Sequence, residues 1–225
     1  MFDYIKENLL QIQEEIAPCK PRIIAVTKYF DADVMIDAYK AGLRDFGESR
    51  VIEASQKIDS LPEEIKANST FHFIGHLQTN KVKQAVKVFD YIHSLDSLKL
   101  AQSISEHSLQ IGKVQKVLIQ INNANEVQKS GFSKEEVFEV FEDIKGLKGL
   151  EVVGVMNMAP LGAAEQELEH LFSEIVSVKK SLEEEFSYKL EEISMGMSQD
   201  YVIAAKAGAT MLRIGRKLFC KYTEE

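Results

Sequence analysis

A lysine at the end of a short apolar run has the position in this chain that most favours covalent chemistry. Residues 23–26 are four consecutive apolar residues, which predict a buried strand, and Lys28 follows directly after Thr27. Asp31 and Asp33 come next, where a helical pattern begins. Lys28 is therefore predicted at the carboxyl end of a strand, where parallel α/β folds bind their ligands.

Two interpretations of Lys28 are open from its position. Partial desolvation at the mouth of an apolar strand would favour the neutral amine, which is a nucleophile that attacks carbonyl groups. A solvated lysine that closes a strand is the plainer interpretation, and position alone favours it.

Two later segments carry residue types that hold phosphate groups. Residues 194–198, Ser-Met-Gly-Met-Ser, precede a predicted helix whose free N–H groups would attract an anion. Ser198 could donate its hydroxyl to the same anion, although plain capping of that helix is the alternative. Gly196 and Gly215 would let the backbone approach a ligand closely. Phosphate sites after strands seven and eight recur in (β/α)8 barrels, and residues 213–216 would follow strand eight.

Several other polar residues have a chemical and a structural interpretation. His72 and His76 are four residues apart, but a predicted strand at His72 removes the shared helical face, so we expect no metal site. His76 is expected as a polar group at the mouth. Glu48 could act as a general base, but a structural ion pair with Arg44 or Arg50 is favoured.

Four methionines cluster at two predicted strand ends, and they are Met156, Met158, Met195 and Met197. Core packing explains them most simply. A soft wall around a planar ligand is the more specific alternative.

Eight predicted strands alternate with predicted helices along the whole chain. The predicted strands end at Lys28 and cover 44–48, 71–75, 91–95, 117–121, 152–156, 190–194 and 210–214. Helices are predicted between them, including one over 51–66 and one over 164–184, with an extra amphipathic helix over 3–17 ahead of the first strand. Ser133 and Glu136 form a capping box for another. This alternation predicts a single (β/α)8 TIM-barrel domain over residues 1–225, with a doubly wound open sheet as the alternative.

Composition narrows the classes of partner. The 225 residues carry a formal net charge of -8 with 28% charged residues, which argues against nucleic acid or an anionic membrane. The acidic and basic residues of the first fifteen positions are unlike a signal peptide, and no apolar run approaches a membrane span. Cys19 and Cys220 lie far apart, which is typical of reduced thiols in a cytoplasmic protein.

Six motifs in this chain resemble the YggS/PROSC family of pyridoxal phosphate homeostasis proteins. The motifs are Ala-Val-Thr-Lys at 25–28, Phe-Gly-Glu-Ser-Arg-Val at 46–51, His-Phe-Ile-Gly-His-Leu-Gln-Thr-Asn-Lys at 72–81, Lys-Ser-Gly-Phe at 129–132, Ser-Met-Gly-Met-Ser at 194–198 and Arg-Ile-Gly at 213–215. The resemblance covers roughly residues 5–219.

The resemblance implies a barrel like the N-terminal domain of alanine racemase, with pyridoxal 5′-phosphate (PLP) held covalently on Lys28 as a Schiff base. It implies that Ser198 and Gly215 contact the phosphate and that Arg213 faces the pyridine nitrogen. Ser49 and Arg216 depart from the family, which usually has asparagine and threonine or serine there. The expected PLP-binding set is Lys28, Ser49, His76, Met156, Ser194, Ser198, Arg213, Gly215 and Arg216.

We expect a cytoplasmic monomer that holds PLP and passes it to apo-enzymes without efficient catalysis. Arg213 is always protonated, so a facing pyridine nitrogen stays unprotonated and withdraws electrons weakly. Racemases of this class add a second base from a C-terminal domain, and we expect none after Glu225. Two alternatives remain open: a PLP-dependent amino-acid racemase, and a barrel that uses Lys28 for aldolase-type chemistry on a sugar phosphate.

Overall fold

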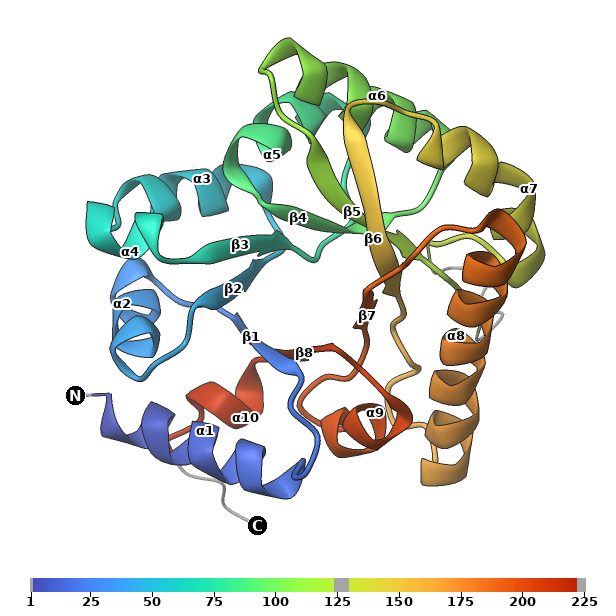
Figure 1. The fold of residues 1–225 in the computed structure, drawn as a ribbon. Helices are drawn as coiled ribbons and strands as arrows, with labels where there is room; N and C mark the ends of the chain where they lie inside the picture. The colour runs from blue at the N-terminus through green and yellow to red at the C-terminus, as the bar shows by residue number, and fades with distance from the viewer. Residues whose placement is uncertain (1, 124–129, 222–225) are drawn as a thin grey trace.

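Eight parallel strands close into a barrel in the computed structural model, which describes residues 2–123 and 130–221 (Figure 1). The strands are β1 (Arg22–Val26), β2 (Asp45–Glu48), β3 (Thr70–Phe73), β4 (Tyr91–Leu95), β5 (Gln115–Gln120), β6 (Leu150–Met156), β7 (Glu192–Ser194) and β8 (Met211–Ile214). Ile24 of β1 pairs with Arg213 of β8, which closes the ring and excludes an open sheet. The predicted (β/α)8 barrel is therefore confirmed.

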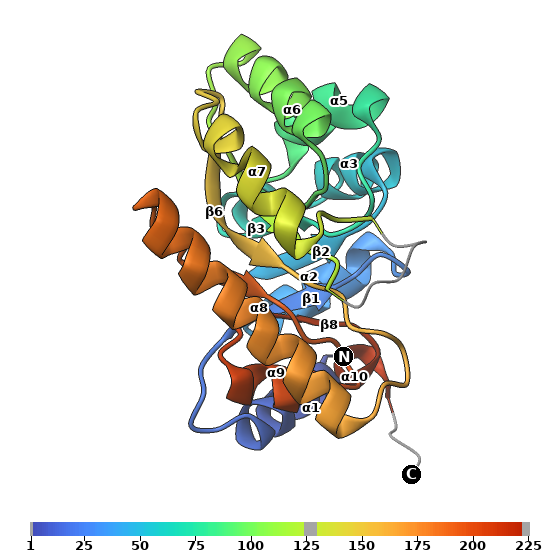
Figure 2. The ribbon, with the colours of Figure 1, turned by 90° about the vertical axis from the view of Figure 1, so that its right-hand side faces the viewer.

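Helices surround the ring of strands on its outside (Figures 1 and 2). They are α1 (Asp3–Glu15), α2 (Ala32–Lys40), α3 (Val51–Asp59), α4 (Glu63–Ala67), η1 (Thr79–Lys81), α5 (Val82–Val88), α6 (Leu98–Gln110), α7 (Lys134–Lys145), α8 (Glu165–Phe186), α9 (Tyr201–Ala207) and α10 (Arg216–Phe219). In the part of the chain that the structure describes, no helix combines the length and apolarity that crossing a bilayer requires.

Local sequence signals explain some of the helix ends. Ser133 and Glu136 make both hydrogen bonds of the predicted capping box at the start of α7. The single helix predicted over 51–66 is wrong, because α3 ends at Asp59 and α4 begins at Glu63. Pro62 disfavours the helical conformation of the residue before it and cannot donate a backbone hydrogen bond, so the chain breaks there.

The predicted N-terminal helix is confirmed as α1, and it packs against α10, a short helix that the sequence pattern does not predict (Figure 1). The Asn8 side chain donates to the carbonyl oxygens of Leu218 and Cys220, at 3.0 and 2.9 Å. These bonds satisfy carbonyl groups at the end of α10 that have no partner within the helix. The start of the chain therefore holds in place the helix that follows the last strand.

A small apolar cluster occupies part of the barrel interior. Ile24, Leu118, Met156 and Met211 are fully buried there, and they come from strands on opposite sides of the ring. Met156 therefore packs in the core, which confirms the simpler of the two interpretations given for it. Contact between Met156 and a ligand stays a prediction.

Gly196, directly after β7, is required by the fold. Its φ of +87° is in the left-handed region, and an added Cβ would lie 2.5 Å from the Cβ of Ala204 in α9. Close packing on α9, rather than approach to a ligand, is thus the reason that this structure gives for the glycine.

We expect Gly196→Ala to lower the free energy of unfolding by about 3 kcal/mol, from backbone strain plus overpacking. Gly42→Ala is the matched control, because Gly42 has a φ of +107° but open space around its Cβ position. It should cost only the backbone term, about 1 kcal/mol. Urea unfolding of both variants measures the difference, and equal losses would show that the contact with Ala204 contributes nothing.

Candidate functional site

Lys28 lies at the mouth of the barrel, just beyond the carboxyl end of β1. Its side chain is exposed, with Nζ 5.0 Å from the centroid of the Tyr29 ring. The backbone on either side is held: Thr27 is fully buried, and the ring of Phe30 packs 4.9 Å from that of Phe219 in α10. The structure thus presents a solvated amine on a fixed segment of backbone.

A buried ion pair holds the residue before Lys28. The Lys57 ammonium donates to Glu48 Oε1 at 2.7 Å and to the carbonyl oxygen of Thr27 at 2.9 Å. The Thr27 hydroxyl donates to the same Glu48 oxygen at 2.7 Å. Glu48 is 2% exposed, so this carboxylate depends on both donors for its compensation.

The prediction that Glu48 pairs with Arg44 or Arg50 is wrong. Arg44 donates to backbone carbonyl groups and stacks on Tyr39, while Arg50 lies 3.8 Å from Glu53. The sequence did hold a signal for the real partner. Lys57 comes three residues after buried Ala54 in α3, which places it on the core-facing side, and a lysine there needs a carboxylate.

Ser198 meets the start of α10. Its hydroxyl oxygen accepts hydrogen bonds from the backbone N–H groups of Gly215 and Lys217, at 3.2 and 3.3 Å. The alternative that Ser198 caps the helix after it is wrong, because that helix, α9, begins at Tyr201 and Asp200 stands at its cap position. The structure brings the two predicted phosphate segments together, but the helix N-terminus beside Ser198 belongs to α10.

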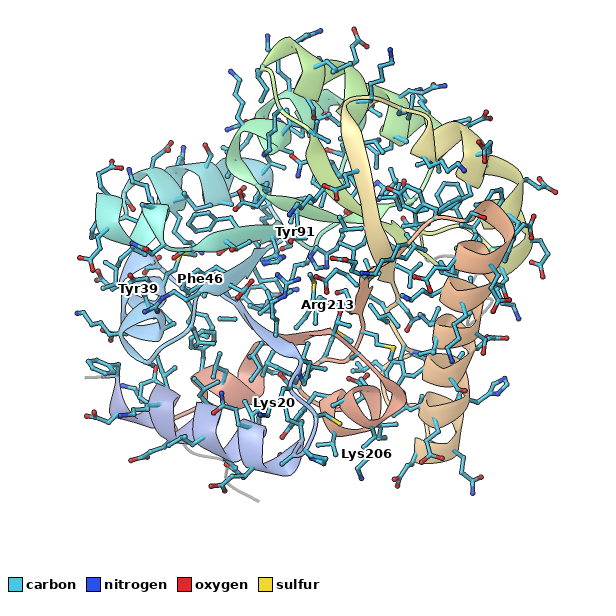
Figure 3. All side chains as sticks on the ribbon, viewed as in Figure 1. Lys20, Tyr39, Phe46, Tyr91, Lys206 and Arg213 are labelled. Atoms are coloured by element: carbon cyan, nitrogen blue, oxygen red, sulfur yellow. The ribbon has the colours of Figure 1, made fainter. Side chains whose placement is uncertain are left out.

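Arg213 is buried inside the ring of strands (Figure 3). Its Nη1 donates to Ser194 Oγ at 2.6 Å, and its Nη2 donates to the carbonyl oxygen of Asn157 at 2.8 Å. Burial lowers the pKa of Arg213 to about 10, against the attraction of Asp200, so the group remains a cation at neutral pH. The predicted residues Ser194 and Arg213 therefore form one buried pair.

Ser49 and His76 line a shallow pocket of about 200 Å³ next to the ends of β2 and β3. His76 is exposed, with Nδ1 3.1 Å from Asp96 Oδ2 and 3.2 Å from Ser130 Oγ. Its neighbour Gly75 brings the two loops together, because an added Cβ would lie 2.3 Å from the carbonyl oxygen of Ser49.

Arg216 is exposed as the first residue of α10. Lys129, from the fourth motif, lies outside the described residues.

Two buried histidines connect to Arg213 through Ser194: His72, whose place in the sequence raised only the question of a metal ligand, and His93, which the sequence pattern does not single out. His93 Nδ1 is 2.9 Å from Ser194 Oγ, His93 Nε2 is 2.9 Å from His72 Nδ1, and His72 Nε2 is 3.0 Å from Asp45 Oδ1. Both imidazoles are fully buried. We call Asp45, His72, His93, Ser194 and Arg213 the interior network.

Burial keeps both histidines of the interior network neutral. It lowers the pKa of His72, against the attraction of Asp45, and it lowers the pKa of His93 well below its ordinary value, with the neighbouring His72 adding to the effect. The charged groups around the pair are Asp45, Asp90, Arg22 and Arg213.

These pKa directions predict how stability depends on pH. Below about pH 6.5 the unfolded chain binds protons at His72 and His93, whereas the folded protein keeps both imidazoles neutral. The free energy of unfolding therefore falls as the pH decreases toward 5. The slope should be shallower in His93→Gln than in the wild type. Urea unfolding across this range measures it, and identical slopes in wild type and His93→Gln would contradict the prediction.

Comparison with known proteins agrees with this geometry. The family described as alanine racemase, N-terminal domain, matches residues 2–222. A pyridoxal phosphate homeostasis protein of Synechocystis sp. (strain ATCC 27184 / PCC 6803 / Kazusa) is 39% identical over 202 residues, covering 90% of this chain and 92% of its own length. One of Mus musculus is 34% identical over 229 residues, covering 96% of this chain and 82% of its own.

Solved structures show the same relationship. PipY of Synechococcus elongatus PCC7942 with PLP bound has a TM-score of 0.86 at 33% identity, covering 96% of this chain and 99% of its own. Without PLP, the TM-score of PipY is 0.90 at 34% identity. An alanine racemase of Clostridium difficile 630 has a TM-score of 0.79 at 17% identity, with 58% of its chain covered, and this likeness shows the fold alone.

The closed barrel with a lysine at the mouth of its first strand is thus of the alanine racemase N-terminal domain class. Within that class, the chain belongs to the family of pyridoxal phosphate homeostasis proteins, which confirms the resemblance seen in its motifs.

Proposed function

We propose that this protein binds PLP, with the amine of Lys28 bonded to the aldehyde carbon as a Schiff base, and serves to hold and deliver the cofactor. The observation that carries the proposal is the arrangement of the ends of β1 and β8. An exposed amine follows β1, and the paired strand β8 carries buried Arg213 and leads to two backbone N–H groups that meet a serine hydroxyl. The PLP-bound structure of PipY, at 33% identity, supports it.

The chemistry of this donor set fits the three parts of PLP. An amine suits the aldehyde, because the two condense to an imine. The N–H groups of Gly215 and Lys217 now share one acceptor, the Ser198 oxygen, and phosphate oxygens are stronger acceptors for such groups. The hydrogen bonds to Ser194 and Asn157 occupy two of the five N–H groups of Arg213, and another can face the ring nitrogen.

The same residues favour holding PLP over amino-acid turnover. When bound, PLP supplies an aldehyde and an electron-withdrawing ring. Arg213 remains a cation and offers only donors, so it keeps the ring nitrogen that it faces unprotonated. A ring in that state stabilises negative charge on a substrate weakly, and we expect racemisation by the pure protein to be slow.

Gly215→Ala tests the phosphate half of the proposal. Nothing lies closer than 3.5 Å to the position of an added Cβ, so the fold tolerates the methyl group. A phosphate group bound against this backbone would collide with it. We expect unchanged thermal stability and an increase of about tenfold in the dissociation constant for PLP, followed by visible absorbance. Unchanged affinity in a folded variant would exclude Gly215 from the site. Absence of a PLP-dependent visible band in the wild-type protein would contradict the whole proposal.

We also propose that the protein acts in the cytoplasm as a monomer and passes PLP to enzymes that lack it. The free thiols of Cys19 and Cys220 support a reducing compartment. The exposed position of Lys28 supports transfer, since an acceptor amine can reach the same carbon from solvent.

A further inference from the structure

The interior network crosses the barrel from one side to the other. It begins at Asp45 on β2, passes through His72 and His93 on the next two strands, and reaches Ser194 on β7 and Arg213 on β8. Because β4 and β7 are not neighbours in the ring, the contact between His93 and Ser194 runs through the interior. The two imidazoles and the serine are fully buried, and Arg213 is 4% exposed.

The chemistry of its two ends gives this network a direction. Arg213 can only donate hydrogen bonds, and the Asp45 carboxylate can only accept them. Four hydrogen bonds join the five residues, and with neutral imidazoles four hydrogens are available for them. One arrangement satisfies all four bonds. Arg213 donates to Ser194, Ser194 to His93 Nδ1, His93 Nε2 to His72 Nδ1, and His72 Nε2 to Asp45.

Adding a proton to the network would break this arrangement. A cationic imidazole has no acceptor nitrogen, so with a fifth hydrogen His93 would donate to Ser194, and the Ser194 hydroxyl hydrogen would have no acceptor in the network. Burial opposes such a cation independently. The Ser194 oxygen is thus left as an acceptor for Arg213, and donation from Ser194 to His93 strengthens it in that role.

We propose that Asp45, His72, His93 and Ser194 are positioning residues, whose directed hydrogen bonds fix the orientation of Arg213 and so set the charge state of the aromatic ring that it faces. The ligand half of this inference rests on the proposed function, and the hydrogen-bond direction does not. The Asp45 carboxylate at the far end also lies 3.9 Å from the Arg22 guanidinium, and Asp200 is the acid that attracts Arg213.

Nitrogen NMR of the histidine side chains tests the direction without any ligand. The chain has five histidines, and His72→Gln and His93→Gln variants assign the two buried ones. At neutral pH we expect both imidazoles to be neutral, each with its proton on Nε2 and a bare Nδ1. A proton on Nδ1 of either ring, or a cationic ring, would overturn the directed network.

A pair of serine variants tests the effect on the bound ring. Ser194→Ala cuts the network beside Arg213. Ser94→Ala makes the same change at a serine that is 1% exposed, adjoins His93, and makes no hydrogen bond with its hydroxyl among the described residues. With PLP added, we expect Ser194→Ala to shift the pH midpoint of the visible band by about one unit and to speed release of PLP about tenfold, the effect of one lost charge-assisted hydrogen bond. Ser94→Ala should match the wild type.

Asp45→Asn provides the distant test, because it removes the charge at the far end and keeps an acceptor oxygen for His72. A smaller shift of the visible band in the same direction as in Ser194→Ala supports transmission through the network. Identical spectra in Ser194→Ala, Asp45→Asn and Ser94→Ala would overturn the positioning role. If NMR shows the expected tautomers but the protein binds no PLP, the result supports the directed network and contradicts the proposed function.

Discussion

Replacing Lys28 with alanine is expected to abolish the visible absorbance band that PLP develops on the wild-type protein. The band requires conjugation between the cofactor and an amine, and Lys28 is the amine that the end of β1 presents at the mouth. The phosphate donors on β8 and α10 remain in this variant. We therefore expect residual, non-covalent binding that is weaker by at least about a hundredfold, measured by equilibrium dialysis.

Lys28→Arg and Lys81→Ala are the controls for this experiment. Lys28→Arg keeps the positive charge but cannot form the imine, so it should lack the band as well. Lys81 lies in η1 after β3 and lines the pocket beside His76, so its removal changes the charge of the mouth and spares the proposed linkage. A full visible band in Lys28→Ala, or its loss in Lys81→Ala, would move the linkage to another residue.

The largest loss of stability is expected from Lys57→Met. The side chains of Glu48 and Lys57 are 3% and 12% exposed, and their atoms lie 2.7 Å apart. Removing the lysine leaves a carboxylate buried with one hydroxyl donor, which costs about 3–5 kcal/mol of unfolding free energy. Urea unfolding measures this loss, and PLP binding should weaken too, because Lys57 also holds the carbonyl oxygen of Thr27.

A double variant separates lost pairing from lost packing. Glu48→Gln combined with Lys57→Met removes the buried charge, so it should recover much of the stability lost in Lys57→Met alone. Lys189→Met is the surface control, since Lys189 and Glu191 are 79% and 67% exposed, and it should change stability little. A Lys57→Met variant as stable as Lys189→Met would show that the buried pair does not hold the mouth of β1.

The barrel could be predicted because several of its strands carry a clear local signal. Apolar runs such as residues 23–26 and 117–121 exceed what a loop tolerates, and their alternation with amphipathic helices leaves few topologies. The positions of Lys28 and Arg213 follow from strand ends alone. Family motifs then assigned roles to them that spacing could not.

What could not be predicted depends on contacts between distant residues. The four residues of α10 are too few to show helical periodicity, so Ser198 was assigned to the wrong helix end. His93 and Ser194 are 101 positions apart and meet only because the ring closes. Strand alternation marks them as inward-facing, but the hydrogen bonds of the interior network require the register of five strands.

Borohydride reduction of the wild-type protein with PLP, followed by peptide mass mapping, tests the central claim most directly. Reduction converts a Schiff base into a stable amine and so records which lysine held the cofactor. We predict one reduced adduct per chain, on Lys28. An adduct confined to a different lysine, or no adduct at saturating PLP, would contradict the account.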